Sequence, residues 1–463
     1  MNFFTQHLAT LRGHFYNALW RWHTYIGILI VPFILLLGLT GILMLASGPI
    51  DHYFNKNLHH VSVGENTLPP SALLNQVKKA YPDLKTQLYL PPKQADHTAR
   101  FVLVKAGGGR GGNHGGHGSG QHKITVHINP YTGAILGEAK PGRSLYSKFK
   151  KLHGTLFLGD LGDTIIETIA GLSILILVSG LVLVVSRWKI RSLIPKFPLT
   201  YRQDWSRLHK SLGLVIALPL LLFLLSGLAW TNIWGGQIVQ AWSSLPSKRY
   251  EPSLASETHQ ALNSAGVHQV AWAVEKKPLP KSVGNLAQSA VNIDWVVEHS
   301  QILGFDYYRV HFPQGKRSAW TISASTIAGD IQNPFKEQIV HIDQYTGEVL
   351  QEISFADYSL LGKAMAAFVP LHQGDLGLWN ILLNIAICLL IVIAMISAVI
   401  MWWISRTRRK QLPKQSSRPI KGQRTLAVTM IFVAVIFPLS ALALIVIATV
   451  DYLLHRFKRV AKV

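Results

Sequence analysis

Residues 21–46 read RWHTYIGILIVPFILLLGLTGILMLA, an apolar run with no charged side chain after its first residue. A helix needs about 20 predominantly apolar residues to cross a hydrocarbon core of roughly 30 Å. This stretch is therefore long enough to span a membrane. It also exceeds the apolar core of a signal peptide, and no clear A-x-A-like cleavage site follows it, so we expect the span to be retained.

Runs of this kind dominate the chain. Of its 463 residues, 49% are hydrophobic and 15% are charged, and the mean hydropathy is +0.25, which is too apolar for an ordinary soluble enzyme. The sequence predicts a mainly α-helical integral membrane protein with five spans. They lie at about residues 24–47, 165–186, 210–234, 377–404 and 426–450.

The basic residues predict how the spans are oriented. The net charge is +22, and Lys and Arg are dense in two short connections, 187–207 and 406–424. Short basic loops stay on the cytoplasmic side, so we expect a cytoplasmic N-terminus and the long segments 48–150 and 235–360 outside, in a periplasm. Four basic residues after residue 455 would then lie outside, against the same rule. The placement of the charge favours a lipid bilayer, and not nucleic acid, as the partner.

The first and third spans open with the same spacing, R-x-H-x3-G-x12-[ST]-G, without a gap. The matched positions are Arg21 and Arg207, His23 and His209, Gly27 and Gly213, Thr40 and Ser226, and Gly41 and Gly227. A second pair of histidines repeats as well, because His153 and His372 each lie 33 residues before a Ser-Arg pair. Fixed spacing of this kind indicates an internal duplication.

The long external segments repeat too. HINPYTG at residues 127–133 matches HIDQYTG at residues 341–347, and the first follows a short alternation of apolar residues that is typical of a strand. The predicted unit is a span, an external α+β module and a second span, used twice, with a fifth C-terminal span outside the duplication. The expected divisions are, in order, 1–47, 48–150, 151–188, 189–234, 235–360, 361–405, 406–425 and 426–463.

Four histidines recur at matched positions at or near the membrane: His23, His209, His153 and His372. An ionisable side chain at membrane depth is costly and indicates function. Neutral imidazole is the usual axial ligand of haem iron. The sole cysteine, Cys388, lies within the fourth span, which excludes disulfides within the chain and a covalently attached c-type haem. We therefore expect b-type haem, held by coordination and packing.

Glycines accompany two of these histidines. Gly27 and Gly213 lie four residues after the histidine of their own span, on the same helix face. Gly41 and Gly227 lie 18 residues after it, five turns on, and return to that face. We expect these four glycines to leave space for a flat macrocycle. Close helix–helix packing is the alternative explanation, since small residues serve it as well.

Depth in the membrane decides how the histidines pair. His23 and His209 lie at the cytoplasmic ends of their predicted spans and would share one haem iron. His153 and His372 lie at the outer ends and would share a second. Three acidic residues between positions 160 and 167 interrupt the start of the second span, so an interfacial helix is the alternative place for His153.

Taken together in this order, the motifs resemble those of the PepSY-associated transmembrane proteins. They are W-R-W-H-x3-G at 20–27, L-H-G at 152–154, L-H-Q-G-D-L-G at 371–377 and the two Y-T-G segments, and the resemblance covers about residues 15–405. Di-haem ferric-siderophore reductases of the bacterial inner membrane belong to that family. The resemblance implies that the four repeated histidines bind haem, and that electrons from the inner side reduce a ferric siderophore outside and release Fe(II).

No nucleotide-binding motif accompanies these features. The chain has neither a P-loop nor a G-x-G-x-x-G fingerprint after a predicted strand. The electron donor is therefore expected to be a quinol, a cytoplasmic reductase or another membrane protein. Two other classes remain as alternatives: a PepSY-type binding or regulatory protein of the envelope without redox activity, and a transporter, which the lack of acidic residues at the span centres disfavours.

Several further histidines have weaker signals. The tract at 106–122, GGGRGGNHGGHGSGQHK, is expected to be a flexible insertion, with loose metal capture as the alternative. His127 and His341 match across the repeat, and we expect them to be solvated on strand faces, with a redox or metal role as the alternative. His52, His59 and His60 follow the first span, where they could approach an outer haem or a ferric ligand.

Overall fold

The computed structural model describes residues 2–105, 123–140, 142, 144–186, 190–239, 258–259, 262, 272–274, 277–283, 291–407, 435–447 and 449. By its internal contacts the chain forms two compact units. The first, the membrane unit, comprises residues 1–42, 151–235 and 383–463. The second, the sheet unit, comprises residues 43–150 and 236–382.

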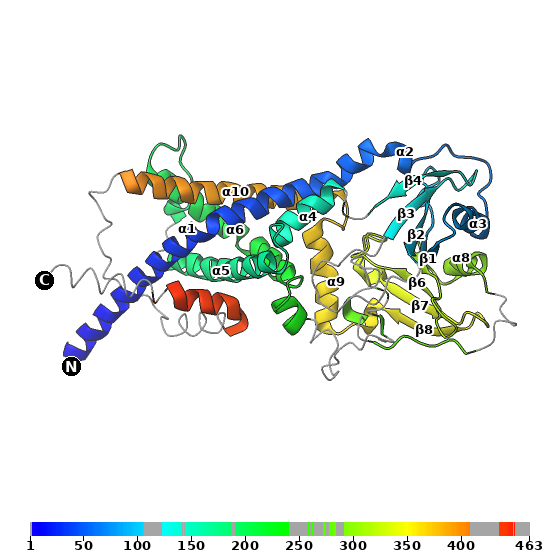
Figure 1. Cartoon of the computed structure of the whole chain (residues 1–463). Helices are drawn as coiled ribbons and strands as arrows, with labels where there is room; N and C mark the ends of the chain where they lie inside the picture. The colour runs from blue at the N-terminus through cyan, green and yellow to red at the C-terminus, as the bar shows by residue number, and fades with distance from the viewer. Residues whose placement is uncertain are drawn as a thin grey trace. The chain divides into compact units, whose positions relative to one another are not determined.

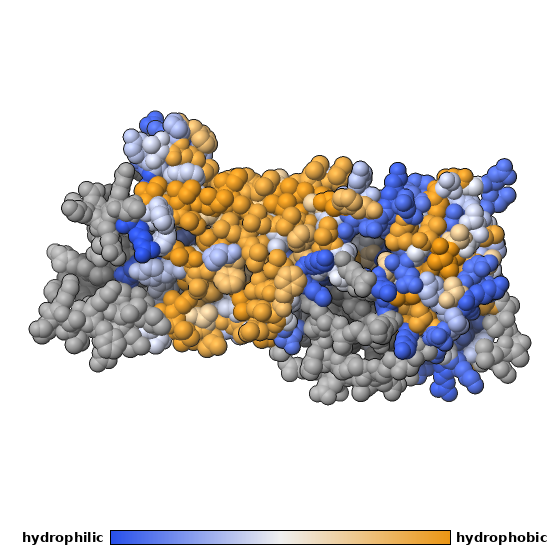
Figure 2. Space-filling model, turned by 45° about the horizontal axis from the view of Figure 1, so that its top comes forward, coloured by the Kyte–Doolittle hydropathy of each residue, from blue (hydrophilic) through white to orange (hydrophobic). Residues whose placement is uncertain are grey.

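Four helices in the described ranges are long and apolar enough to cross a membrane. They are α1 (Asn2–Phe54), α5 (Asp160–Val185), α6 (Arg202–Leu228) and α10 (Leu378–Thr407). Isoleucine and leucine side chains from all four helices form a shared core, and Figure 2 shows a broad apolar surface over them. Four of the five predicted spans thus have a matching helix.

The predicted fifth span, 426–450, is described only at residues 435–447 and 449. Its described part contains a short apolar helix, Pro438–Ile447, which is shorter than a full span. The helix packs against the rest of the membrane unit. The ring centroids of Phe437 and Trp234 are 5.6 Å apart, and Ser440 Oγ donates to the Thr168 carbonyl at 3.2 Å. The fifth span stays a prediction.

Two short helices carry the second pair of histidines. His153 lies in the last turn of α4 (Leu145–Thr155) and His372 in the last turn of α9 (Leu360–Gln373). Positive φ angles separate each from the span that follows, at residues 156, 157 and 159 and at residues 374 and 377. Left-handed residues end a helix, so the expectation that these histidines lie at the ends of the spans themselves was wrong. His153 has the interfacial-helix position that the sequence left as the alternative.

The acidic residues that interrupt the second span have a structural role. Asp163 accepts a hydrogen bond from the Asn232 amide at 2.9 Å, and Glu167 accepts from the amides of Ile233 and Trp234 at 3.2 and 3.3 Å. Both carboxylates lie at the start of α5 and are buried. They satisfy backbone N–H groups in the turn after α6, which would otherwise be buried without acceptors.

The sheet unit contains one antiparallel sheet of eight described strands in the order β4-β3-β2-β1-β5-β6-β7-β8 (Figure 1). The strands are β1 (Leu84–Leu90), β2 (Ala99–Lys105), β3 (Lys123–Ile128), β4 (Ile135–Ala139), β5 (Arg309–His311), β6 (Trp320–Ala324), β7 (Gln338–Ile342) and β8 (Val349–Ser354). The two predicted external modules supply four strands each. They join where Leu88 pairs with His311 and Tyr89 with Val310.

Helices α3 (Pro70–Ala80) and α8 (Ile293–Ile302) pack against one face of this sheet. Buried residues of both helices and of strands from both modules form a single core. The other short helices of the described ranges are α2 (Lys56–His59), η1 (Ile190–Ser192), η2 (Trp234–Val239), η4 (Trp272–Val274), η6 (Pro334–Lys336) and η7 (Phe355–Asp357).

The repeated Y-T-G segments form the turns after β3 and β7. Asn129 Oδ1 accepts from the amide of Tyr131 at 2.8 Å, and Asp343 Oδ1 accepts from that of Tyr345 at 2.7 Å. Each turn ends in a glycine with positive φ, 72° at residue 133 and 79° at residue 347. The repeated sequence thus encodes an Asx turn closed by a left-handed glycine.

Candidate functional site

Three of the four repeated histidines lie in the membrane unit. His23 is on α1, His209 is on α6, and His153 ends α4. His372, at the end of α9, belongs to the sheet unit. Both pairings, His23 with His209 and His153 with His372, stay predictions.

His23 is hydrogen-bonded to α5 through one ring nitrogen. Its Nδ1 lies 2.9 Å from Ser179 Oγ, and that hydroxyl donates to the Ile176 carbonyl at 2.9 Å. Because the Ser179 hydroxyl proton is donated to the Ile176 carbonyl, Ser179 Oγ accepts and His23 Nδ1 donates. The ring approaches α5 closely: a Cβ on Gly180 would lie 2.9 Å from His23 Cε1. Only glycine leaves room for the imidazole at this point.

His209 is held in the same way by α10. Its Nδ1 lies 3.1 Å from the Ala394 carbonyl oxygen and 3.1 Å from Ser397 Oγ. A carbonyl oxygen only accepts, so His209 Nδ1 carries the proton. Each of the two histidines that begin the repeated motif therefore meets a serine on the neighbouring span.

His153 follows the same rule with a residue of α1. Its Nδ1 lies 2.8 Å from Thr40 Oγ1, whose hydroxyl donates to the Leu36 carbonyl at 2.7 Å. Thr40 Oγ1 therefore accepts, and His153 Nδ1 donates. Thr40 belongs to the repeated motif of the first span, which gives that motif position a structural role.

In all three imidazoles the second ring nitrogen, Nε2, is left without a proton. With the proton on Nδ1, Nε2 keeps its lone pair, and the described residues offer no hydrogen-bond partner to Nε2 of His23, His153 or His209. Metal-binding histidines usually donate their second ring nitrogen to a protein acceptor in this manner. Each of the three imidazoles thus has one ring nitrogen bonded to the protein and the other with a free lone pair.

Two arginines lie next to this arrangement. Arg21 and Arg207 precede His23 and His209 by two residues, and within the described ranges the buried Nε of each has no hydrogen-bond partner. Asp204 Oδ1 accepts from Arg207 Nη1 at 3.3 Å and leaves Nε unmatched. Buried donors without acceptors are rare, so two at equivalent positions point to an acceptor outside the described residues. The carboxylates of haem propionates have that chemistry, so the residues present fit the predicted cofactor.

The glycines predicted to line the cofactor fall into two groups. A Cβ on Gly27 or Gly213 would meet no atom of the described structure within 4 Å, so there is open space beside both. A Cβ on Gly41 would lie 3.9 Å from His153 Cε1 and 3.5 Å from Cys388 Sγ. Gly41 therefore lies beside His153. Gly227 lies near the end of α6.

Sequence reasoning did not identify several of these partners. Ser179 and Ser397 are polar residues within apolar spans, and that isolation was the available signal. For Arg21 and Arg207 the sequence indicates only that they belong to the duplicated motif. The contacts of all four depend on which helix faces which, and sequence spacing does not supply that.

His127 and His341, expected to be solvated, are buried, with exposed fractions of 2% and 0%. His127 Nδ1 lies 3.1 Å from Thr98 Oγ1, and His341 Nδ1 lies 2.9 Å from Thr321 Oγ1. Burial lowers the pKa of each imidazole to about 3. The expectation was wrong because other parts of the sheet unit cover this face of the strands; His259 Nε2, for example, lies 2.8 Å from His341 Nε2.

Membrane-length helices and an antiparallel sheet with packed helices define an integral membrane protein that also contains an α+β unit. The family model of the PepSY-associated TM region matches residues 20–405. The chain belongs to this family. No curated protein matches it.

Proposed function

We propose that this protein transfers electrons across the bacterial inner membrane through two b-type haems and reduces a ferric siderophore on the periplasmic side. It would thus be a haem-dependent ferric-chelate reductase that releases Fe(II) for uptake. The observation that carries the proposal is the common state of His23, His153 and His209, in which Nδ1 donates to the protein and Nε2 keeps its lone pair. A binding module without redox chemistry has no use for that arrangement.

Haem b, when bound, supplies a one-electron couple. His23 and His209 would hold one haem, and His153 and His372 the other. The chain's own contribution is orientation: Ser179 and the Ala394 carbonyl fix the rings of the first pair, and Thr40 fixes His153. The apolar core of the spans keeps water away from these groups.

The proposed substrate needs one electron for each iron. Oxygen ligands of a siderophore hold Fe(III) tightly and Fe(II) weakly, so reduction releases the metal without breaking a covalent bond. A quinol or a cytoplasmic reductase would supply the electron; a quinol gives two electrons and two protons, enough for two ferric ions.

A reduced-minus-oxidised visible spectrum of the purified protein, with haem quantified per chain, tests the proposal. We expect two b-type haems with bis-histidine bands. His23→Ala and His209→Ala should each remove the same haem and leave the other, while His299→Ala, in α8 of the sheet unit, should change neither. Fe(II) production from a ferric siderophore by the reduced protein then tests the reaction.

Retention of both haems in the His23 and His209 variants would overturn the pairing. Protein without haem, purified from haem-replete cells, would contradict the redox function and favour the envelope-binding alternative.

A further inference from the structure

Five imidazoles and one carboxylate gather in the sheet unit. The group lies where the end of α1 and helix α2 meet the residues that precede β2. Its members are His52, His59, His60, Asp96, His97 and His127. Sequence analysis singled out four of these histidines; Asp96 and His97 join them only in the fold.

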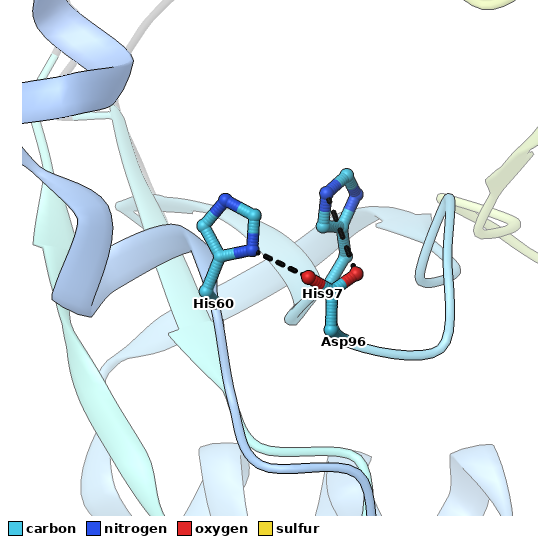
Figure 3. A group of neighbouring side chains, drawn as sticks. All are labelled: His60, Asp96 and His97. Atoms are coloured by element: carbon cyan, nitrogen blue, oxygen red, sulfur yellow. Dashed lines mark hydrogen bonds and ion pairs between the residues drawn. The ribbon is translucent and has the colours of Figure 1, made fainter.

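Three residues at the centre of the group have the donors of a metal site. His60 Nδ1 lies 2.8 Å from Asp96 Oδ2, and His97 Nε2 lies 3.9 Å from Asp96 Oδ1. Figure 3 shows both imidazoles joined to the Asp96 carboxylate. One nitrogen or oxygen atom from each residue lies within 4.8 Å of the other two. Two ligand atoms at about 2.1 Å from one ion lie at most about 4.2 Å apart, so rotation of the side chains closes the difference.

The backbone holds these residues in place. His60 and His97 form an antiparallel β-bridge, the Val61 amide donates to the Asp96 carbonyl at 2.9 Å, and the Thr98 amide donates to the His59 carbonyl at 3.0 Å. The two segments are 36 residues apart in sequence and are fixed to each other before any ion binds. A prearranged backbone lowers the entropic cost of ligation.

A fourth donor lies next to them. His52 Nε2, from the last turn of α1, lies 2.7 Å from His60 Nε2, and its ring stacks on that of His59 with centroids 4.9 Å apart. Three imidazoles and a carboxylate would complete the four-coordinate nitrogen and oxygen set that divalent transition ions accept.

The same atoms could serve only as a hydrogen-bonded chain from Asp96 through His60 to His52. Exposure argues against that explanation: the side chains of His60, Asp96 and His97 are 25%, 46% and 23% exposed, so an ion can reach them from solvent. The purely structural pair of this unit differs, because His259 and His341 are both 0% exposed and contact each other without a carboxylate.

We propose that His60, Asp96 and His97 bind one divalent first-row transition ion, with His52 as the fourth ligand. Imidazole and carboxylate donors suit Zn²⁺, Fe²⁺ and Co²⁺. The site requires no haem and therefore does not depend on the proposed reductase function. If that function holds, the released Fe(II) belongs to the class of ions that this site binds.

Equilibrium dialysis of the full-length, tag-free protein in detergent against Co²⁺, with cobalt measured by mass spectrometry, tests the site. Cobalt is the probe because haem iron does not contribute to its signal. The background carries His114→Ala, His117→Ala and His122→Ala, which removes the histidines of the Gly/His tract. We expect one tight equivalent of Co²⁺ in that background, and a dissociation constant raised by about tenfold or more when His60→Ala or His97→Ala is added.

His299→Ala is the matched control, because His299 is half-buried in the same unit but hydrogen-bonds to the Trp295 carbonyl, away from the group. Asp96→Asn keeps the shape of the side chain, so its weaker Co²⁺ binding would support the site even where a histidine variant fails to fold. In addition, Co²⁺ should raise the unfolding temperature of the parent protein and not that of Asp96→Asn. Loss of binding in the tract background alone, or unchanged affinity in the His60 and His97 variants, would overturn the proposal.

Discussion

The hydrogen bond between His23 and Ser179 determines which imidazole nitrogen carries a proton in the membrane unit. The same inference holds at His209 and His153, each through a different acceptor. An acceptor that binds one ring nitrogen of an imidazole orients the ring and raises the basicity of its other nitrogen as a metal ligand. Substitution of the residues that contact these rings therefore tests the proposed ligands as directly as substitution of the histidines.

Ser179→Ala removes the acceptor of the His23 Nδ1 proton. We expect haem affinity at that site to fall by about 10–100-fold, because the ring loses its orientation. Titration of the apoprotein with haem, followed in the visible spectrum, measures the change. Ser173→Ala is the control, since Ser173 Oγ donates to the Ile169 carbonyl of its own helix. Equal haem affinity in the two variants would show that Ser179 does not orient the ligand.

Gly27→Leu separates the cofactor explanation of the glycines from the packing explanation. A side chain at Gly27 meets no described protein atom within 4 Å, so the fold should tolerate it. If haem occupies that space, the haem content per chain should fall from two to one with the unfolding temperature nearly unchanged. Gly48→Leu, on the same helix and also without a neighbour within 4 Å, should keep both haems. A full complement of haem in Gly27→Leu would contradict the cofactor explanation.

Among the elements, the short helices α4 and α9 are separate from the spans α5 and α10 that follow them. Each ends at a histidine and a left-handed break before a span begins. Asn380 supports the second break, since its Nδ2 donates to the Leu371 carbonyl at 2.8 Å. Because this side chain satisfies a carbonyl at the helix end, the break is built into the fold and does not result from a weak helix.

Buried histidines on strands β5 and β7 make the stability of the sheet unit depend on pH. Burial lowers the pKa of His311 and of His341 to about 3, from 6.5 in an unfolded chain. Below pH 6.5 the unfolded chain therefore binds protons that the folded chain does not. Stability is fully present above that pH and is lost as the pH falls toward 3, by up to about 1.4 kcal/mol per pH unit for each histidine.

Hydrogen exchange of β5–β7 in the full-length protein, corrected for the intrinsic pH effect, should show lower protection at pH 5 than at pH 7. His341→Gln should reduce this difference, because glutamine does not titrate. His299→Gln should retain it. Equal protection at the two pH values in the parent protein would contradict the expected proton linkage.

On the scale of the whole molecule, the two external modules of the sequence share one core. Phe101 of the first module and Val310 and Ile322 of the second belong to the same buried cluster, and each is 0% exposed. The seam between the modules is the short β1–β5 pairing. Continuous packing across that seam indicates that the modules unfold together.

Phe101→Ala should test this cooperativity, since removing a buried phenylalanine typically costs about 3–5 kcal/mol. We expect hydrogen-exchange protection to fall in β6 and β7 of the second module as well as in β2. Phe335→Ala, at an exposed position of the same unit, should leave both modules unchanged. Loss of protection confined to β1–β4 would show that the modules fold independently.

The sequence by itself determined the membrane class, four of the spans, the repeated histidines and the repeated Y-T-G segments. These features depend on local composition and spacing. About 20 apolar residues favour a membrane-spanning helix, and an Asn-x-Tyr-Thr-Gly segment favours a turn, whatever the rest of the chain does. The family membership over residues 20–405 rests on the same local motifs.

Only the tertiary structure decided which residues meet. It joined two modules into one sheet, moved His153 and His372 onto separate helices, buried His127 and His341, and placed Ser179 and Ser397 against histidines. It also brought Asp96 and His97 to His60. These outcomes depend on contacts between segments tens to hundreds of residues apart, which packing sets and local spacing does not encode.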